Sequence, residues 1–252
     1  MTRSAPVVVK VSGDLLRTTE TAPNLLGLRA ERALVLVVGF GVQLSTWMEE
    51  RDFAVRFRDG RRVTTEEVLP GVRTCAEQAV ETAADVISRD LGREALDLSS
   101  AVAARPADDA ALGRAGRVEH VDKSPLLRAI GRGSVPIVAP SVTDSNGNGL
   151  NVNADELAAD VAIALGASRL VFCTWFPGVL DSSGNVIDEM TPTAALELVN
   201  QGVARTGMAF KLRQAARAAC AGCSVRIVAH DLTDEGTLLR GRCRADDEED
   251  PG

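Results

Sequence analysis

Short β-branched runs that end in glycine constrain this chain more than any other feature of its sequence. Residues 7–11 form one such run and lead into residues 12–13 (Ser-Gly), and residues 33–38 form a second run that leads into residues 39–41 (Gly-Phe-Gly). Runs of this kind predict buried strands, and the glycines predict tight turns where the strands end. Stretches with helical spacing follow the runs, which predicts a mainly parallel sheet covered by helices on both faces.

The same pattern continues along the chain and predicts the other elements. Two hairpins are expected, one over residues 52–64 with Asp59-Gly60 at its turn and one over residues 175–187 with Gly184-Asn185 at its tip. Residues 95–120 are expected to be irregular or to form short strands. Further strands are predicted at residues 135–138, 170–173 and 224–229, and helices at 44–50, 65–91, 155–165, 192–200 and 210–221.

Length and charge narrow the class of protein. With 252 residues, 45% of them apolar, the chain can fill one large α/β unit or two closely joined lobes. No apolar stretch reaches the roughly 18 residues that span a bilayer, and the first residues lack a secretory signal, so a cytoplasmic location without membrane contact is expected. The net charge of −7 argues against nucleic-acid binding, and residues 246–250 are expected to belong to a solvated acidic tail.

The five cysteines do not predict a disulfide framework, because their number is odd and they are scattered through a long chain. Cys220 and Cys223 form a lone CxxC where a helix is expected to end before a strand. No second pair or histidine cluster accompanies them, so structural thiols are expected rather than a redox or metal site.

Three charged residues suggest chemistry. Lys10 ends an apolar strand, Lys211 begins a helix, and Asp155 lies at the N-terminus of another helix. Two lysines and one carboxylate suit the transfer of a phosphoryl group between two anions, although each residue alone could equally form an ordinary salt bridge. Gly13 and Gly39 end the first two strands, where backbone N–H groups suit a phosphate, but tight turns alone would also explain them.

Six segments together resemble the amino-acid kinase family, in particular its N-acetylglutamate kinases. They match from about Val7 to Ala229 in the order and approximate spacing of that family, and the combination of NVNAD, PGVLD and GM-x-x-K is highly specific. The segments are VVVKVSGDLL, VLVVGFG, FRDGRRVTTEE, VPIVAPSVTDSNGNGLNVNADELA, ALGASRLVFCTWFPGVLDSSGNVI and QGVARTGMAFK.

The resemblance implies a fold and an activity. The fold would be a three-layer αβα sandwich, with an acceptor-binding lobe at residues 1–166, a nucleotide-binding lobe at 167–241 and the acidic tail at 242–252. The activity would be the ATP-dependent and Mg²⁺-dependent phosphorylation of the side-chain carboxylate of N-acetyl-L-glutamate, or of a closely related N-acylated acidic amino acid, to an acyl phosphate in arginine biosynthesis. A homodimer would also be expected.

Carried over residue by residue, the resemblance assigns roles to matching positions. Lys10 and Lys211 match the catalytic lysines, and Asp155 matches the aspartate that holds them, with no protein metal ligand expected. The acceptor would be bound by Phe40, Gly41, Arg62 and Asn151, and its phosphoryl group by Gly13 and Gly39. The nucleotide would be bound by Trp175, Phe176, Pro177, Gly178, Val179, Leu180, Val203, Ala204 and Arg205.

Three departures from the family pattern leave alternatives open. Phe40 replaces a glycine, Ser12 replaces the first glycine of a Lys-x-Gly-Gly turn, and Trp175 replaces an aspartate. We expect the Phe40 ring to line the acceptor pocket, and Trp175 to stack on adenine or fill its space. The alternatives are a kinase for an acidic amino acid of a specialised pathway or one linked to a small acidic carrier protein, and a catalytically weak small-molecule-binding homologue.

Overall fold

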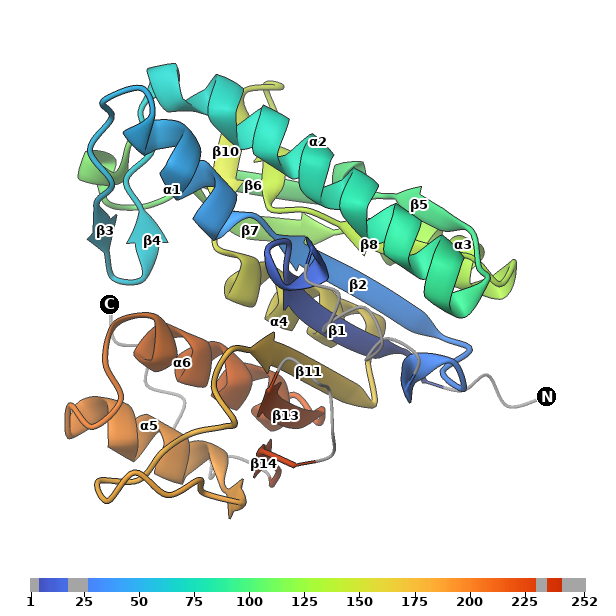
Figure 1. Ribbon diagram of the computed structural model, residues 1–252, viewed down its shortest axis with the longest axis vertical. Coiled ribbons are helices and arrows are strands. Elements are labelled where there is room, and N and C mark those ends of the chain that lie inside the picture. Colours follow the sequence, from blue (N-terminus) through green and yellow to red (C-terminus); the bar gives the residue numbers. More distant parts are fainter. Residues whose placement is uncertain (1–4, 18–26, 230–234, 242–252) are drawn as a thin grey trace.

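An eight-stranded, mainly parallel sheet forms the middle layer of the molecule (Figure 1). The computed structural model describes residues 5–17, 27–229 and 235–241, so the predicted acidic tail lies outside the described residues. Within the sheet, β13 and β14 are the antiparallel neighbours, and the other neighbouring strands are parallel. The strands, in spatial order, are β12 (Glu189–Met190), β14 (Thr237–Leu239), β13 (Ser224–Ala229), β11 (Arg169–Thr174), β1 (Val7–Ser12), β2 (Leu34–Gly39), β8 (Val135–Val138) and β5 (Ala95–Asp97).

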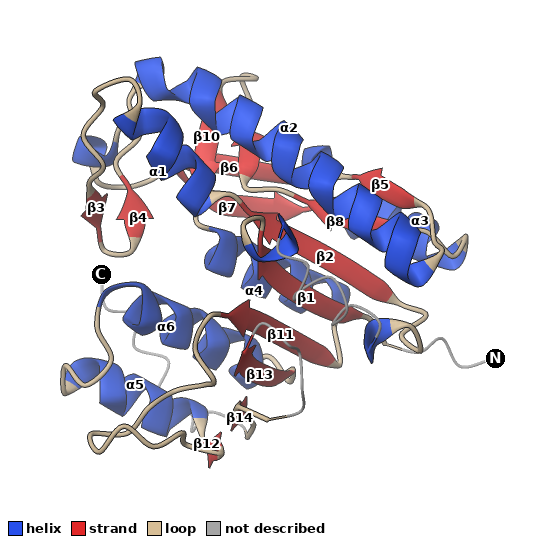
Figure 2. Ribbon diagram, viewed as in Figure 1, coloured by secondary structure: helices blue, strands red, loops and turns tan. Residues whose placement is uncertain are grey.

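Helices cover both faces of this sheet (Figure 2), which confirms the predicted three-layer αβα architecture. One apolar cluster joins one face of the sheet to α1 and α2, and a second joins the other face to α3, α4, α5 and α6. The helices are α1 (Gly41–Glu49), α2 (Leu69–Val86), α3 (Lys123–Gly131), α4 (Ala154–Leu165), α5 (Pro192–Asn200) and α6 (Thr206–Cys220). None of these described helices combines the length and apolar character that a membrane crossing requires.

The alternation of side chains along β1 decides where Lys10 points. Val7, Val9 and Val11 belong to the cluster on the α1–α2 side, whereas Val8 belongs to the cluster on the α4–α6 side. Successive side chains of a strand point to opposite faces, so Lys10 leaves the sheet on the same face as Val8. The strand therefore directs the lysine towards α4.

A small closed barrel stands beside the large sheet. It consists of β6 (Val102–Pro106), β7 (Ala115–Val121), β9 (Ser141–Thr143) and β10 (Gly149–Val152). This confirms short strands in the segment 95–120. A separate hairpin pairs β3 (Phe57–Arg58) with β4 (Arg61–Arg62), and its two turn residues have positive φ values of 45° at Asp59 and 74° at Gly60, as the Asp-Gly pair predicts.

Three local predictions need correction. Helix α1 begins at Gly41 rather than at residue 44, since its first backbone hydrogen bond runs from Leu44 N to Phe40 O at 2.9 Å. Helix α6 begins at Thr206 rather than at residue 210, so Lys211 lies inside the helix and not at its start. The predicted thiol of Cys220 is instead disulfide-bonded. Cys220 is half-buried at the last residue of α6, whereas Cys223 is a buried thiol as predicted.

Candidate active site

Lys10 and Lys211 meet at a single oxygen of Asp155. The Lys10 Nζ lies 3.2 Å and the Lys211 Nζ lies 2.9 Å from Asp155 Oδ1. The lysines come from β1 and α6, and the carboxylate comes from the first turn of α4. All three side chains are largely buried, with exposed fractions of 13% for Lys10 and Asp155 and 10% for Lys211. The three residues to which the family resemblance assigned catalytic roles therefore lie together.

Electrostatics keeps the carboxyl group of Asp155 charged. Burial raises the pKa of the Asp155 carboxyl, but the adjacent ammonium groups of Lys10 and Lys211 outweigh burial and hold that pKa at about 2. Burial lowers the pKa of Lys211 below its ordinary value, although Asp155 opposes the shift. The Lys211 Nζ also lies 4.9 Å from the centre of the Phe172 ring, whose face attracts a cation. Asp155 is therefore an anion at neutral pH.

Asn153 fixes the turn that carries Asp155. Its Oδ1 accepts a hydrogen bond from Asp155 N at 2.8 Å and caps α4, while its Nδ2 donates to Gly60 O at 2.8 Å. This amide therefore ties the tip of the β3–β4 hairpin to the helix of the carboxylate. The sequence analysis assigned no role to Asn153, although the preference of asparagine for N-caps could have suggested one.

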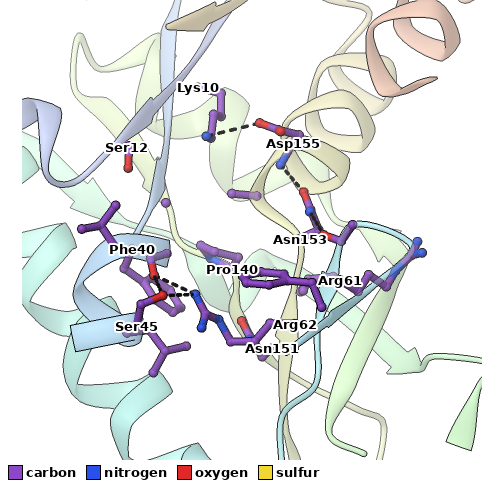
Figure 3. Close-up of a pocket in the computed structure, with 18 residues that line it drawn as sticks. Lys10, Ser12, Phe40, Ser45, Arg61, Arg62, Pro140, Asn151, Asn153 and Asp155 are labelled. Atoms are coloured by element: carbon purple, nitrogen blue, oxygen red, sulfur yellow. Dashed lines mark hydrogen bonds and ion pairs between the residues drawn. The ribbon is translucent and has the colours of Figure 1, made fainter. Parts of the chain in front are cut away.

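A cavity of about 370 Å³ opens beside the cluster (Figure 3). Its walls come from the ends of β1 and β2, the first turn of α1, the β3–β4 hairpin and the segment that leads into α4. The sequence-predicted site residues that line it are Lys10, Gly39, Phe40, Gly41, Arg62, Asn151 and Asp155. The expected acceptor residues therefore share one cavity with the phosphoryl-transfer cluster.

Arg62 supplies a buried positive charge in this cavity. Its Nη2 donates hydrogen bonds to Gly41 O at 2.7 Å and to Ser45 Oγ at 2.9 Å, both on α1 (Figure 3). Its Cζ lies 4.7 Å from the centre of the Phe57 ring. Burial lowers the pKa of Arg62, yet an arginine remains protonated near neutrality. The guanidinium is therefore fixed in place before an anion arrives.

The N-terminus of α1 adds backbone donors beside Arg62. The first N–H groups of a helix have no partner within it and carry partial positive charge. In the described part of the chain no side chain caps α1 at Phe40, and the first-turn residues Gly41 and Val42 line the cavity. Together with Arg62, this turn suits a carboxylate or a phosphoryl group.

The glycines at the strand ends allow close approach of the backbone. A Cβ at Gly39 would lie 3.3 Å from Ala154 Cβ and 3.6 Å from Lys10 Cε. Gly13 lies outside the cavity lining, but its N–H donates to Gly39 O at 2.6 Å, and a Cβ at Gly13 would lie 2.7 Å from Gln43 Nε2. These two residues therefore hold the ends of β1 and β2 together, whereas their predicted contact with phosphate stays a prediction.

Asn151 is buried at the back of the cavity, with 8% of its surface exposed. Its Nδ2 donates to the hydroxyl of Thr64 at 3.0 Å, which fixes the orientation of the amide. The side chain thus lines the cavity as expected, and its contact with the acceptor stays a prediction.

Phe40 only partly meets the expectation that its ring lines the cavity. The residue borders the cavity, but it is 2% exposed and belongs to the apolar cluster with Leu44 and Met48. Its backbone has φ −131° and ψ 27°, which residues other than glycine can adopt. The turn therefore accommodates phenylalanine without strain and buries most of it in the core.

The predicted nucleotide residues lie outside this cavity, in two segments: residues 175–180 directly follow β11, and residues 203–205 directly precede α6. Several present apolar surface, with exposed fractions of 51% for Trp175, 58% for Phe176 and 42% for Val203. The Trp175 indole donates a hydrogen bond to Asp14 Oδ2 at 3.0 Å, and the Ser12 hydroxyl donates to the other oxygen of Asp14. Trp175 is thus held against the turn that follows Lys10.

Two ammonium groups that share one carboxylate beside an anion-accepting cavity suit the transfer of a phosphoryl group from one anion to another. The fold and the site therefore define a phosphotransferase. The amino acid kinase family matches residues 5–229, nearly the whole chain, and this chain belongs to that family.

Individual relatives agree with this assignment. The acetylglutamate kinase of Chloroflexus aggregans is 36% identical over 242 residues, which cover 91% of this chain and 94% of that enzyme. The solved structure of smu.665 from Streptococcus mutans has a TM-score of 0.81 at 27% identity and covers 93% of this chain and 98% of its own. The N-acetylglutamate synthase of Neisseria gonorrhoeae shares the fold, with a TM-score of 0.85 at 19% identity over 95% of this chain and 60% of its own. At the level of the family, the chain is an ATP-dependent carboxylate kinase.

Proposed function

We propose that this protein transfers the γ-phosphoryl group of ATP to the side-chain carboxylate of N-acetyl-L-glutamate or of a closely related N-acylated acidic amino acid. The observation that carries the proposal is the shared contact of Lys10 and Lys211 with Asp155 at the rim of the cavity. The identity to acetylglutamate kinases supports the acceptor. The product would be an acyl phosphate.

The acceptor would be held by positive groups that are already in place. Arg62 and the first turn of α1 would bind its carboxylates, and Asn151 would hydrogen-bond to it from the back of the cavity. A carboxylate has a pKa of about 4 and is already ionised at neutral pH, so the reaction needs no general base.

In the reaction, a carboxylate oxygen of the acceptor would bond to the γ-phosphorus of ATP as the bond from that phosphorus to the β–γ bridging oxygen breaks. ADP leaves with the bonding electron pair, and no proton changes place. Lys10 would offset charge on the acceptor side and Lys211 on the nucleotide side, while Asp155 keeps both amines in position. Catalysis thus consists of positioning and charge stabilisation.

The nucleotide would lie against the loop 175–180, residues 203–205 and the start of α6. In the described part of the chain no side chain caps α6 at Arg205, so the backbone N–H groups of its first turn are suited to phosphates, with Lys211 one turn further on. No described cluster of three or more His, Cys, Asp or Glu side chains could hold a metal ion, so Mg²⁺ would be bound chiefly through the phosphates of ATP. Bound there, Mg²⁺ would neutralise part of the phosphate charge.

A carrier-linked acceptor is a second candidate, favoured by one observation. Residues 56–58 (Arg-Phe-Arg) are exposed on the hairpin beside the cavity, although Arg58 also pairs with Asp109 at 3.2 Å. An acidic carrier could be attracted to these arginines while its attached amino acid enters the cavity.

Hydroxylamine trapping of the acyl phosphate tests these proposals. Purified protein with ATP and Mg²⁺ is offered N-acetylglutamate, N-acetylaspartate, free glutamate, N-acetyl-2-aminoadipate and an acidic carrier protein with a C-terminal glutamate. Hydroxamate formation with N-acetylglutamate, lost in Lys211→Met but kept in the matched Lys123→Met, supports the main proposal. Hydroxamate formation only with the carrier moves the assignment to the second candidate, and equal activity of Lys211→Met and the unaltered protein refutes the mechanism.

A further inference from the structure

Arg61, next to the acceptor-side Arg62, makes a contact that the proposed reaction does not use. The two residues are neighbours on β4, so their side chains leave the strand in opposite directions. Figure 3 shows Arg62 directed to Ser45 on α1, whereas Arg61 extends away from it. The Arg61 Nη2 donates to Glu156 Oε2 at 2.7 Å.

The ion pair between Arg61 and Glu156 is buried. The exposed fractions of the two side chains are 16% for Arg61 and 4% for Glu156. The other carboxylate oxygen of Glu156 lies 3.9 Å from Arg117 Nε on β7, which is a weaker contact. Removing one partner of a buried pair leaves an uncompensated charge, so this pair fixes the distance between β4 and the first turn of α4.

The same hairpin also rests on α6. The Cζ of Arg61 lies 5.1 Å from the centre of the Phe210 ring, within the range of a cation–π contact. A Cβ at Gly60 would lie 2.4 Å from Phe210 Cδ2, so the turn of the hairpin packs directly on that ring. Hairpin and helix are therefore in van der Waals contact at a residue where only glycine fits.

The contacts of Arg61 are adjacent in sequence to the catalytic residues. Glu156 directly follows Asp155 in α4, and Phe210 directly precedes Lys211 in α6. Arg62, the proposed acceptor ligand, directly follows Arg61 itself. One side chain thus joins the three segments that carry the acceptor-binding arginine, the anchoring carboxylate and the nucleotide-side lysine.

We propose that Arg61 is a positioning residue. Through its contacts with Glu156 and Phe210, it holds the hairpin that carries Arg62 at a fixed position relative to the helices that carry Asp155 and Lys211. This inference rests on the proposed roles of Lys10, Asp155 and Lys211. A shift of about 1 Å between reacting groups can cost about 100-fold in rate. Loss of Arg61 should therefore lower kcat while the acceptor KM, set by Arg62, changes little.

The test compares Arg61→Met, Glu156→Leu and the double variant Arg61→Met/Glu156→Leu with the unaltered protein. Each single variant should melt at a lower temperature, because it leaves a buried charge unpaired, and the double variant should recover most of the loss because its apolar side chains have similar volume. At saturating ATP and acceptor, kcat should fall about 10- to 100-fold in Arg61→Met and stay low in the double variant.

The controls distinguish positioning from stability and from binding. Arg117→Met removes the weaker partner of Glu156 and should keep kcat. A double variant that recovers both melting temperature and kcat would show that the pair only stabilises the fold, and a large rise in acceptor KM without loss of kcat would make Arg61 a binding residue. Either result overturns the proposal. Failure of the proposed function is recognised separately, because the unaltered protein would then form no hydroxamate, or Lys211→Met would retain full activity, whatever Arg61→Met does.

Discussion

Phe40 stands where the family pattern has a glycine, and replacing it with glycine tests whether the phenylalanine serves the packing of the core or the choice of acceptor. Phe40 is 2% exposed and packs in the apolar cluster with Leu15, Leu44 and Met48. Truncation of a buried phenylalanine to alanine costs about 3 to 5 kcal/mol of folding free energy, and we expect about 4 kcal/mol here. For a protein of this size, each kcal/mol lowers Tm by about 2 to 4 °C, so Phe40→Gly should melt about 8 to 16 °C lower.

The assay combines calorimetry with kinetics. Scanning calorimetry gives Tm for the unaltered protein, for Phe40→Gly and for the control Phe40→Leu, which leaves a smaller void and should lose clearly less stability. Hydroxamate kinetics then give the ratio of kcat/KM for N-acetylglutamate to that for N-acetyl-2-aminoadipate. This ratio should not change, since most of the ring lies in the core. An unchanged Tm together with a selective gain for N-acetylglutamate would refute the packing argument.

Four further predictions follow from the site. Arg62→Ala should raise the acceptor KM about 10- to 150-fold, because a charge-assisted hydrogen bond to the acceptor is lost, and should leave the ATP KM nearly unchanged. Ser45→Ala, which keeps the guanidinium, is the control. An equal loss of ATP affinity would exclude Arg62 from the acceptor site. Because burial lowers the pKa of Lys211, kcat should begin to fall on the alkaline side below the ordinary lysine pKa of 10.5, and in Lys211→Arg this fall should move to higher pH. A pH–rate profile of both proteins measures this, and a fall at the same pH in both contradicts the prediction. Calorimetric titration should find ATP binding much weaker in chelator than in Mg²⁺, and equal tight binding would argue against a metal carried by the phosphates. Light scattering should give the mass of a homodimer, and a monomeric mass at working concentration would end that hypothesis.

The boundaries of helices and strands were predicted most accurately where they depend only on the preferences of neighbouring residues. Helix α5 starts and ends where predicted, with Thr191 as its cap and Pro192 at its first position, and β13 matches the predicted residues 224–229. The family resemblance predicted that the two lysines would meet at one site. The types of basic residue in the chain give a second indication. The chain has three lysines among its 28 basic residues, and two of the three lie at the site.

Features that depend on distant segments were not predictable from the sequence. The barrel closes through a parallel pairing of β6 with β9, at Ala103 and Thr143, and no local pattern in the sequence indicates a pairing between segments so far apart. Arg61 and Glu156 are 95 residues apart, and a charge on a short hairpin normally indicates a solvated face. The burial of Phe40 was missed because the sequence does not specify the direction of a side chain at a turn.

The hydrogen bonding between β1 and β11 has a consequence for dividing the protein. The boundary predicted at residues 166–167 falls between α4 and β11, yet β11 pairs with β1 in parallel register from Val7–Arg169 to Lys10–Phe172. Separately produced fragments 1–166 and 167–252 would each expose a long apolar strand edge, the kind of surface on which chains aggregate. Only coexpressed halves could cover these edges by joining each other, and Lys10 and Lys211 would face one another only in that reassembled form. The predicted lobes therefore share one continuous sheet, and a chimera of two relatives must preserve this strand pairing to keep its lysines opposed.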